Sequence, residues 1–184
     1  MDNPVPTPEF SRPVRSERIG REPKSRHLEA NAIERGKLAE RLGLLALSRL
    51  VADVEFRRRG GGRIELRGSF EADLVQNCVV TLAPVPASVG ESFEMSFIEV
   101  DPEAEPEARE TIISLEGSEP PEPVEGGAID LGEAVTQQLA VAIDPYPRAP
   151  EAVPGWSDDP ADEAEARPHP FADLAKLRKT GEIP

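Results

Sequence analysis

Cys78 is the only cysteine of the chain and the first candidate for chemistry. A thiol becomes a nucleophile when a nearby base or cation lowers its pKa. The two histidines, His27 and His169, lie in a predicted strand edge and a proline-rich stretch, while the residues next to Cys78 are mainly valines. These surroundings predict a buried structural cysteine whose pKa is not lowered. A single cysteine also cannot build a structural zinc site.

Five arginines around a run of glycines are the best binding candidates. Four of them flank the turn R-G-G-G, and the fifth lies on the outward parity of the next strand: Arg57, Arg58, Arg59, Arg63 and Arg67. Guanidinium groups that converge at an exposed turn suit phosphate oxygens. Only 4% of the residues are aromatic, so stacking platforms for bases are scarce. We expect contacts to RNA phosphates here, and solvated surface arginines are the alternative.

The sequence contains no glycine-rich phosphate-binding loop, no H-E-x-x-H motif and no dinucleotide-binding fingerprint. The glycine run is followed by a predicted strand, whereas phosphate-binding loops open helices. Carboxylates are dense in E-A-E-P-E-A-R-E and D-D-P-A-D-E-A-E, and this composition is typical of solvated segments and not of paired catalytic acids. We expect a non-enzymatic protein with no cofactor and no metal.

The charge is unevenly distributed along the 184 residues. The net charge is −14, yet residues 1–70 hold 15 Lys/Arg against 10 Asp/Glu, and residues 71–184 hold 6 against 25. A basic N-terminal half permits local contact with RNA, and the acidic remainder discourages indiscriminate binding. With 38% hydrophobic residues, no long apolar run and no apolar leader at the N-terminus, we expect one cytoplasmic domain that does not span a membrane.

Strict alternation of apolar and polar residues predicts a long strand over residues 63–82, with Gln76 and Cys78 pointing to the core. Its length predicts a bend, a bulge or a change of partner at Gly68 and at Gln76-Asn77. Residues 51–58 and 63–74 are expected to form a hairpin. A further antiparallel strand with Phe93, Met95 and Phe97 is expected after a turn at P-V-P-A-S-V-G. Shorter strands are predicted at 10–20 and 26–33.

Two helices are predicted to cover this meander. One spans residues 34–47, with Leu38, Leu42 and Leu45 on one face. The second begins after the N-cap Asp130, with Glu133 three residues on, and ends before Pro145. Residues 99–110 and 116–127 are expected to be mobile loops around a short strand at 111–115.

Four segments in a fixed order resemble the YceD family, the large ribosomal RNA subunit accumulation proteins. They are S-R-P-V at 11–14, E-R-x-x-L-A-E-R-L at 34–42, G-S-F-E-A-D-L-V-Q-N-C-V-V-T-L-A-P-V at 68–85, and I-D-L-G-E-A-V-T-Q-Q-L-A-V-A-I-D-P-Y-P-R at 129–148. Many family members carry C-x-R-C-L followed by a Pro-Val pair, and Thr81 stands where their second cysteine would be. The family-motif core here consists of Gln76, Cys78, Thr81 and Pro84.

We therefore predict an α+β domain over residues 10–148, a curved, barrel-like antiparallel meander covered by two helices. Residues 1–9 are predicted to be disordered, and 149–184 to be an acidic, proline-rich, disordered tail in which 171–179 could form a short helix. The resemblance implies a role in 23S ribosomal RNA accumulation and large-subunit biogenesis, with ribosomal RNA or a pre-ribosomal particle as partner. An adaptor that binds a basic ribosomal protein through acidic segments, and an enzyme using Cys78, are the alternatives.

Overall fold

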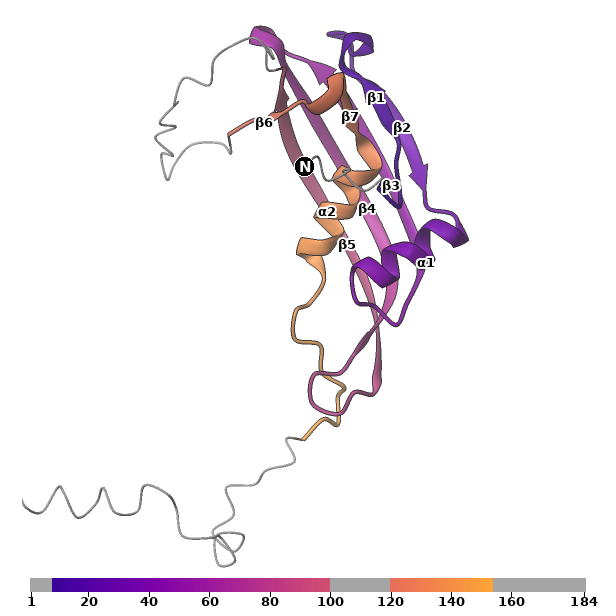
Figure 1. Cartoon of the computed structure of the whole chain (residues 1–184). Coiled ribbons are helices and arrows are strands. Elements are labelled where there is room, and N and C mark those ends of the chain that lie inside the picture. The colour runs from indigo at the N-terminus through magenta and orange to yellow at the C-terminus, as the bar shows by residue number, and fades with distance from the viewer. Residues whose placement is uncertain (1–7, 100–119, 154–184) are drawn as a thin grey trace, which may run out of the picture. The chain divides into compact units, whose positions relative to one another are not determined.

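Long strands with one apolar face form the centre of the fold, and the order in the main sheet is β2-β3-β4-β5-β6 (Figure 1). The computed structural model describes residues 8–99 and 120–153. The strands are β2 Lys24–Glu29, β3 Ala46–Arg58, β4 Arg63–Asn77, β5 Pro84–Ile98 and β6 Glu122–Pro123. Strands β2 to β5 pair antiparallel in sequence order, which confirms the predicted meander, and β6 pairs parallel to β5.

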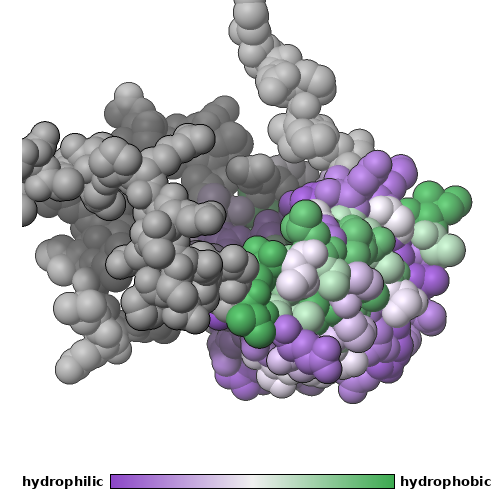
Figure 2. All heavy atoms as spheres, turned by 90° about the horizontal axis from the view of Figure 1, so that it is seen from below, coloured by the Kyte–Doolittle hydropathy of each residue, from purple (hydrophilic) through white to green (hydrophobic). Residues whose placement is uncertain are grey.

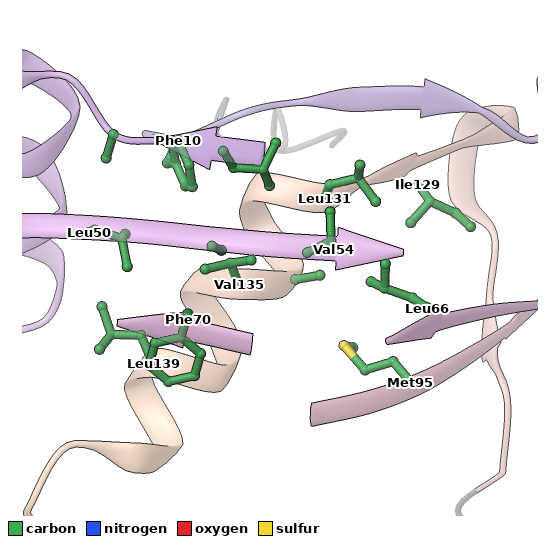
Figure 3. Packing of buried hydrophobic residues seen from close by; sticks show 14 of the residues in the cluster. Phe10, Leu50, Val54, Leu66, Phe70, Met95, Ile129, Leu131, Val135 and Leu139 are labelled. Carbon is green, nitrogen blue, oxygen red and sulfur yellow. The ribbon is translucent and has the colours of Figure 1, made fainter. Parts of the chain in front are cut away.

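One face of this sheet is apolar because alternate residues of each strand share it. The helix α2 (Leu131–Ala142) packs on this face, with Val135 and Leu139 completely buried (Figure 3). The sheet residues beneath it include Leu50, Val54, Leu66, Phe70 and Met95. The main sheet stays open, so the barrel-like expectation is wrong. The helix fills the space over the apolar face, and the core therefore does not require the sheet to close on itself.

The break predicted at Gly68 does not occur, whereas β4 ends at Asn77, where the second break was predicted. β4 pairs without a register shift from Arg63 to Asn77. Gly68 serves close packing here, because a Cβ atom on it would lie 2.8 Å from the Phe93 ring and 2.9 Å from Val54 Cγ1. The irregularity occurs in β3 instead, where the register with β4 shifts between Leu47 and Arg49. This bulge lets Leu47 and Leu50 both be buried although their parity differs.

The P-V-P segment lies inside β5 and does not form the predicted turn. β5 begins at Pro84, opposite Asn77, and β6 pairs only with Phe97 and Ile98 at its other end. The first part of β5 is consequently an edge strand. Proline is tolerated there because its missing N–H faces away from the ladder.

The first helix, α1 (Ala32–Arg41), begins two residues before the predicted helix and ends six residues earlier. Asn31 caps it in a capping box with Glu34, which ends the predicted strand 26–33 at Glu29. Gly43, with φ of +66°, terminates the helical turn. Leu45 is therefore outside the helix and 52% exposed, and the amide N–H of Leu45 donates to the Val75 carbonyl.

A small second sheet joins distant parts of the chain. β1 (Pro13–Arg15) pairs antiparallel with β7 (Ala128–Asp130), and a 3₁₀ turn, η1 (Ser16–Arg18), follows β1. The predicted strand 10–20 is therefore three residues long. Asp130 caps α2 as predicted, by accepting from the amides of Gly132 and Glu133. The Glu133 carboxylate pairs with Arg41 at 2.7 Å and so connects the two helices that cover the sheet.

Several predictions fall outside the described residues: residues 1–7 of the segment 1–9 that was predicted to be disordered, the strand at 111–115, and the tail from residue 154 with its short helix at 171–179. Within the described ranges, part of the predicted loop 116–127 forms β6 and the 3₁₀ turn η3 (Glu125–Gly127). Among these residues there is no helix that is long and apolar enough to cross a membrane.

Two helical glycines give a matched test of the packing. A Cβ atom on Gly132, in the first turn of α2, would overlap the carbonyl oxygen of Phe10, whereas one on Gly36 in α1 would contact nothing within 4 Å. We expect Gly132→Ala to lower the free energy of unfolding by about 1–3 kcal/mol through this overlap. Gly36→Ala should raise it by about 0.5–1 kcal/mol, because alanine has the higher helix propensity. Urea unfolding measures both, and equal effects of the two substitutions would contradict the close contact at Gly132.

Candidate nucleic-acid interface

The β3–β4 hairpin brings the predicted arginines together, but glutamates pair with most of them. Arg57 and Arg59 both donate through Nε to the same Glu65 oxygen, at 3.2 and 2.8 Å. These bonds, with that of Arg59 the larger cause, lower the pKa of Glu65. Arg67 pairs with Glu94 on the neighbouring strand at 2.9 Å. Much of the positive charge predicted for this hairpin is therefore locally compensated.

Arg58 differs from the other hairpin arginines because its side chain bonds to backbone carbonyls of another segment. Its guanidinium donates to the carbonyl oxygens of Ser16 and Ile19, at 2.7 and 3.1 Å, and forms a two-pronged pair with Glu99 at 2.8 and 3.0 Å. The bonds from Arg58 lower the pKa of Glu99 to about 2. Arg58 thus fastens the hairpin to η1. Arg63 makes no ion pair with any residue in the described ranges.

Beside the hairpin lies a second set of cations that the sequence analysis missed. A groove of about 770 Å³ runs between β1 and β2, and four basic side chains line it: Arg15, Arg18, Lys24 and Arg26. We call this feature the basic groove. None of the four forms an ion pair with a carboxylate in the part of the chain that the structure describes. Val14 and Phe56, both nearly buried, also line it.

Strand parity explains why the cations face this groove. Lys24 and Arg26 share the parity of the buried Leu28, and they are paired with Phe56 and Val54 of β3, so they project from the apolar face of the sheet. Charged residues on the inward parity of an edge strand were a usable signal in the sequence. A second signal was the charge of residues 13–27, which hold five Lys/Arg and two Asp/Glu.

The motif residues Gln76 and Cys78 lie at the other end of β4, which spans 15 residues. Both are buried, as predicted, and both hold the segment that follows α2. The Gln76 side-chain amide donates to the Asp144 carbonyl at 2.8 Å, the Ala149 amide donates to the Cys78 sulfur at 3.3 Å, and the Val79 amide donates to the Pro147 carbonyl at 2.9 Å. This end of the molecule is fixed by hydrogen bonds along its backbone.

The loop between β4 and β5 displays apolar side chains at the same end. Val79 is 47% exposed and Leu82, with φ of +59°, is 74% exposed. Figure 2 views the molecule from this end and shows hydrophobic surface gathered among hydrophilic residues. Thr81 donates its amide to the Cys78 sulfur at 3.4 Å, and Pro84 begins β5. The motif residues therefore cluster far from the arginines, about 45 Å along β4 at the usual rise per residue.

Comparison with known proteins finds a family whose matched region includes the motif residues Gln76 and Cys78. The family model described as "Large ribosomal RNA subunit accumulation protein YceD" matches residues 66–178. This is more than half of the chain. The chain belongs to the YceD family. No curated protein and no solved structure matches it. The matched region contains Gln76, Cys78 and the Asp130-capped helix, whereas the basic groove, formed mainly by residues 13–26, precedes it.

Thr81 stands where many YceD family members carry a second cysteine. The thiol of the remaining cysteine, Cys78, has a pKa that differs from the expectation. The pKa of Cys78 is lowered to about 6, first by the Ala149 amide and then by the Thr81 side chain and amide, whose hydrogen bonds stabilise a thiolate. The expectation that the pKa is not lowered was wrong, because the largest cause is a backbone amide from a segment that the sequence does not place beside Cys78. The side chain is nonetheless fully buried. Within the described ranges, no group of three His, Cys, Asp or Glu residues is placed to hold a metal ion.

The lowered pKa predicts a pH-dependent contribution of Cys78 to stability. An unfolded thiol titrates at about 8.5, so the thiolate contribution is complete above that pH and is lost as the pH falls through about 6. We expect the difference in free energy of unfolding between the wild type and Cys78→Ser to grow in favour of the wild type as the pH rises from about 6 to about 8.5. Urea unfolding at several pH values measures it, and other titrations cancel in the difference. A constant difference across the range would contradict a native thiolate.

Arg58 and Arg59 are neighbours with opposite expected roles in stability. Arg58→Gln removes donors from two backbone carbonyls and the partner of Glu99, so we expect a loss of about 1–2 kcal/mol in the free energy of unfolding. Arg59→Gln breaks one exposed ion pair and should cost less than about 0.5 kcal/mol. Thermal or urea unfolding of the two variants decides this. Equal losses would show that Arg58 does not fasten the hairpin to η1.

Proposed function

We propose that this protein is a non-enzymatic factor for large-subunit biogenesis that binds RNA of the assembling particle through phosphate contacts at its basic end. The basic end comprises the basic groove and the adjoining hairpin arginines. Membership of the YceD family connects the chain with accumulation of the large-subunit ribosomal RNA. The direct contact with RNA, and 23S RNA as its target, are the parts that we add.

The observation that supports this proposal is the convergence on one groove of four cations that form no ion pair with any carboxylate among the described residues. An arginine that already pairs with a glutamate must give up that pair to contact a phosphate, whereas an arginine surrounded by water loses only hydration. Each phosphate contact also releases counterions from the RNA, which makes binding favourable at low salt. The basic groove is therefore a stronger RNA contact than the paired part of the hairpin.

The charge of the remaining chain gives this contact an orientation. Residues 71–184 hold 6 Lys/Arg against 25 Asp/Glu, so RNA is repelled from most of the protein. RNA therefore meets the least electrostatic repulsion when it approaches the basic end. Such a distribution favours binding in one orientation and disfavours coating of the protein by RNA.

The two alternatives have less support. The acidic segments 99–110 and 158–165, which an adaptor would use to hold a basic ribosomal protein, lie outside the described residues except for Glu99, and Glu99 is paired with Arg58. An enzyme using Cys78 would need its sulfur to reach a substrate. That sulfur is fully buried, and the groups that hydrogen-bond to it among the described residues belong to Ala149, Thr81 and Val80, with no histidine among them.

Two triple variants with the same change of charge test the RNA contact. One is Arg15→Gln/Arg18→Gln/Arg26→Gln in the basic groove, and the other is Arg57→Gln/Arg59→Gln/Arg67→Gln in the paired hairpin. Fluorescence anisotropy with large-subunit RNA fragments at several salt concentrations gives the slope of log affinity against log salt. We expect the groove variant to lower the slope by about 2, at 0.7–0.9 for each lost phosphate contact, and the hairpin variant to lower it by less than about 1.

Arg58 is retained in both variants because it fastens the fold. Circular dichroism and thermal melting establish that each variant is folded before binding is measured. Unchanged affinity and slope in a folded groove variant would refute the RNA contact at this site. Equal losses in both variants would assign binding to net charge alone.

A further inference from the structure

The unpaired edge of β2 gives the basic groove a second recognition element besides charge. Ala30 donates its amide to Leu50 of β3 at 3.1 Å, and the backbone groups of alternate residues point to opposite sides of a strand. Lys24, Arg26 and Leu28 therefore direct their backbone N–H and C=O groups to β3. Ser25 and His27 direct theirs away from it. Because β2 lies at the end of the sheet order, these groups meet no further strand formed by residues 8–99 or 120–153.

We infer that the basic groove accepts an extended stretch of unpaired RNA, with its phosphates on the groove cations and its base edges on the backbone of β2. This inference rests on the proposed function and names the class of RNA. A strand edge presents a donor and an acceptor together, as the edge of an unpaired base does. In a duplex, the corresponding edges are already used for base pairing.

The dimensions and lining of the groove agree with single nucleotides. Its volume of about 770 Å³ lies within the range of small-ligand clefts. Lys24 and Arg26 are two residues apart on one face, so their Cα atoms are separated by about 6.6 Å along the strand. Lys24 and Arg26 thus lie along β2, the same edge strand that offers the backbone groups.

A duplex fits this surface poorly. Recognition of double-stranded RNA uses contacts spread over about 16 base pairs, across two successive minor grooves. Here four unpaired cations line one groove, and three of the hairpin arginines beside it, Arg57, Arg59 and Arg67, are paired with Glu65 and Glu94. An acidic peptide could add to the edge of β2 as a strand, but the four cations that line the groove and the family's connection with ribosomal RNA favour a nucleic acid.

Ser25→Pro tests the role of the strand edge separately from charge. Proline removes an N–H that points away from β3, so the β2–β3 ladder stays intact. In the full-length protein, we measure anisotropy with a mixed-sequence 12-nucleotide RNA strand and with its duplex. The single strand should bind at least tenfold more tightly than the duplex. Ser25→Pro should weaken single-strand binding about fivefold with an unchanged salt slope, and Ser25→Ala, which keeps the N–H, should bind normally.

Each other outcome is decisive. Duplex binding that equals or exceeds single-strand binding, with a salt slope that depends on the groove arginines, overturns this inference and leaves the proposed function in place. No salt-dependent binding of either RNA overturns the proposed function itself. Displacement of the RNA by an equal concentration of a 12-residue acidic peptide, with affinity reduced by Ser25→Pro, assigns the groove to a protein partner and also overturns the inference. If Ser25→Pro does not fold, His27→Pro removes the next outward N–H and takes its place.

Discussion

The carboxylate of Asp130 makes the contact on which the arrangement of the N-terminal half depends. It accepts hydrogen bonds from the Arg12 amide at 2.7 Å and the Ser11 hydroxyl, and it caps α2 through the Gly132 amide at 3.0 Å. One side chain therefore satisfies donors from the helix start and from a segment almost 120 residues away. The lack of a side chain on Gly132 lets the Phe10 carbonyl approach the helix closely. Without this contact, neither the entry of the chain nor the start of the helix would have a fixed position over the sheet.

The consequences extend from this contact to the basic groove. β1 follows Arg12 directly and pairs with β7, which ends at Asp130, so the position of β1 beside β2 is set by the same carboxylate. The Arg12 side chain lies over the Phe10 ring, 4.6 Å from its centroid, and pairs with Glu34 at the start of α1. The two walls of the groove are thus a strand of the main sheet and a strand held by a helix cap. A groove of this kind is built by long-range contacts, although its cations lie within 12 residues of sequence.

The sequence was most informative where one local pattern determined the structure. Alternation predicted the apolar face of β3 and β4, and the Asp130 cap predicted the start of α2, because both depend on residues within one element. The length of β5 could not be predicted in the same way: Pro84 and Pro86 are typical of a turn unless the strand lies at an edge, and edge position is a property of the assembled sheet. The bulge between Leu47 and Arg49 was hidden for a similar reason, because only pairing with β4 reveals which residues must reach the core.

The candidate site shows the same limit, since the charge of an arginine is visible in a sequence but its partner is not. Arg57 and Glu65 are directly opposite each other in the β3–β4 register, and Arg67 is opposite Glu94, so pairing of strands neutralises the cluster that first drew attention. Residues 13–27 have fewer arginines, and neither these arginines nor Lys24 form an ion pair among the described residues. Meanwhile the most recognisable motif, Gln76 and Cys78, holds the segment after α2 at the far end of β4. In this protein the positions that identify the family stabilise its frame, and the surface that we propose for RNA precedes the matched region. The surface that we propose for RNA can therefore change in charge by substitution without disturbing the motif that identifies the family.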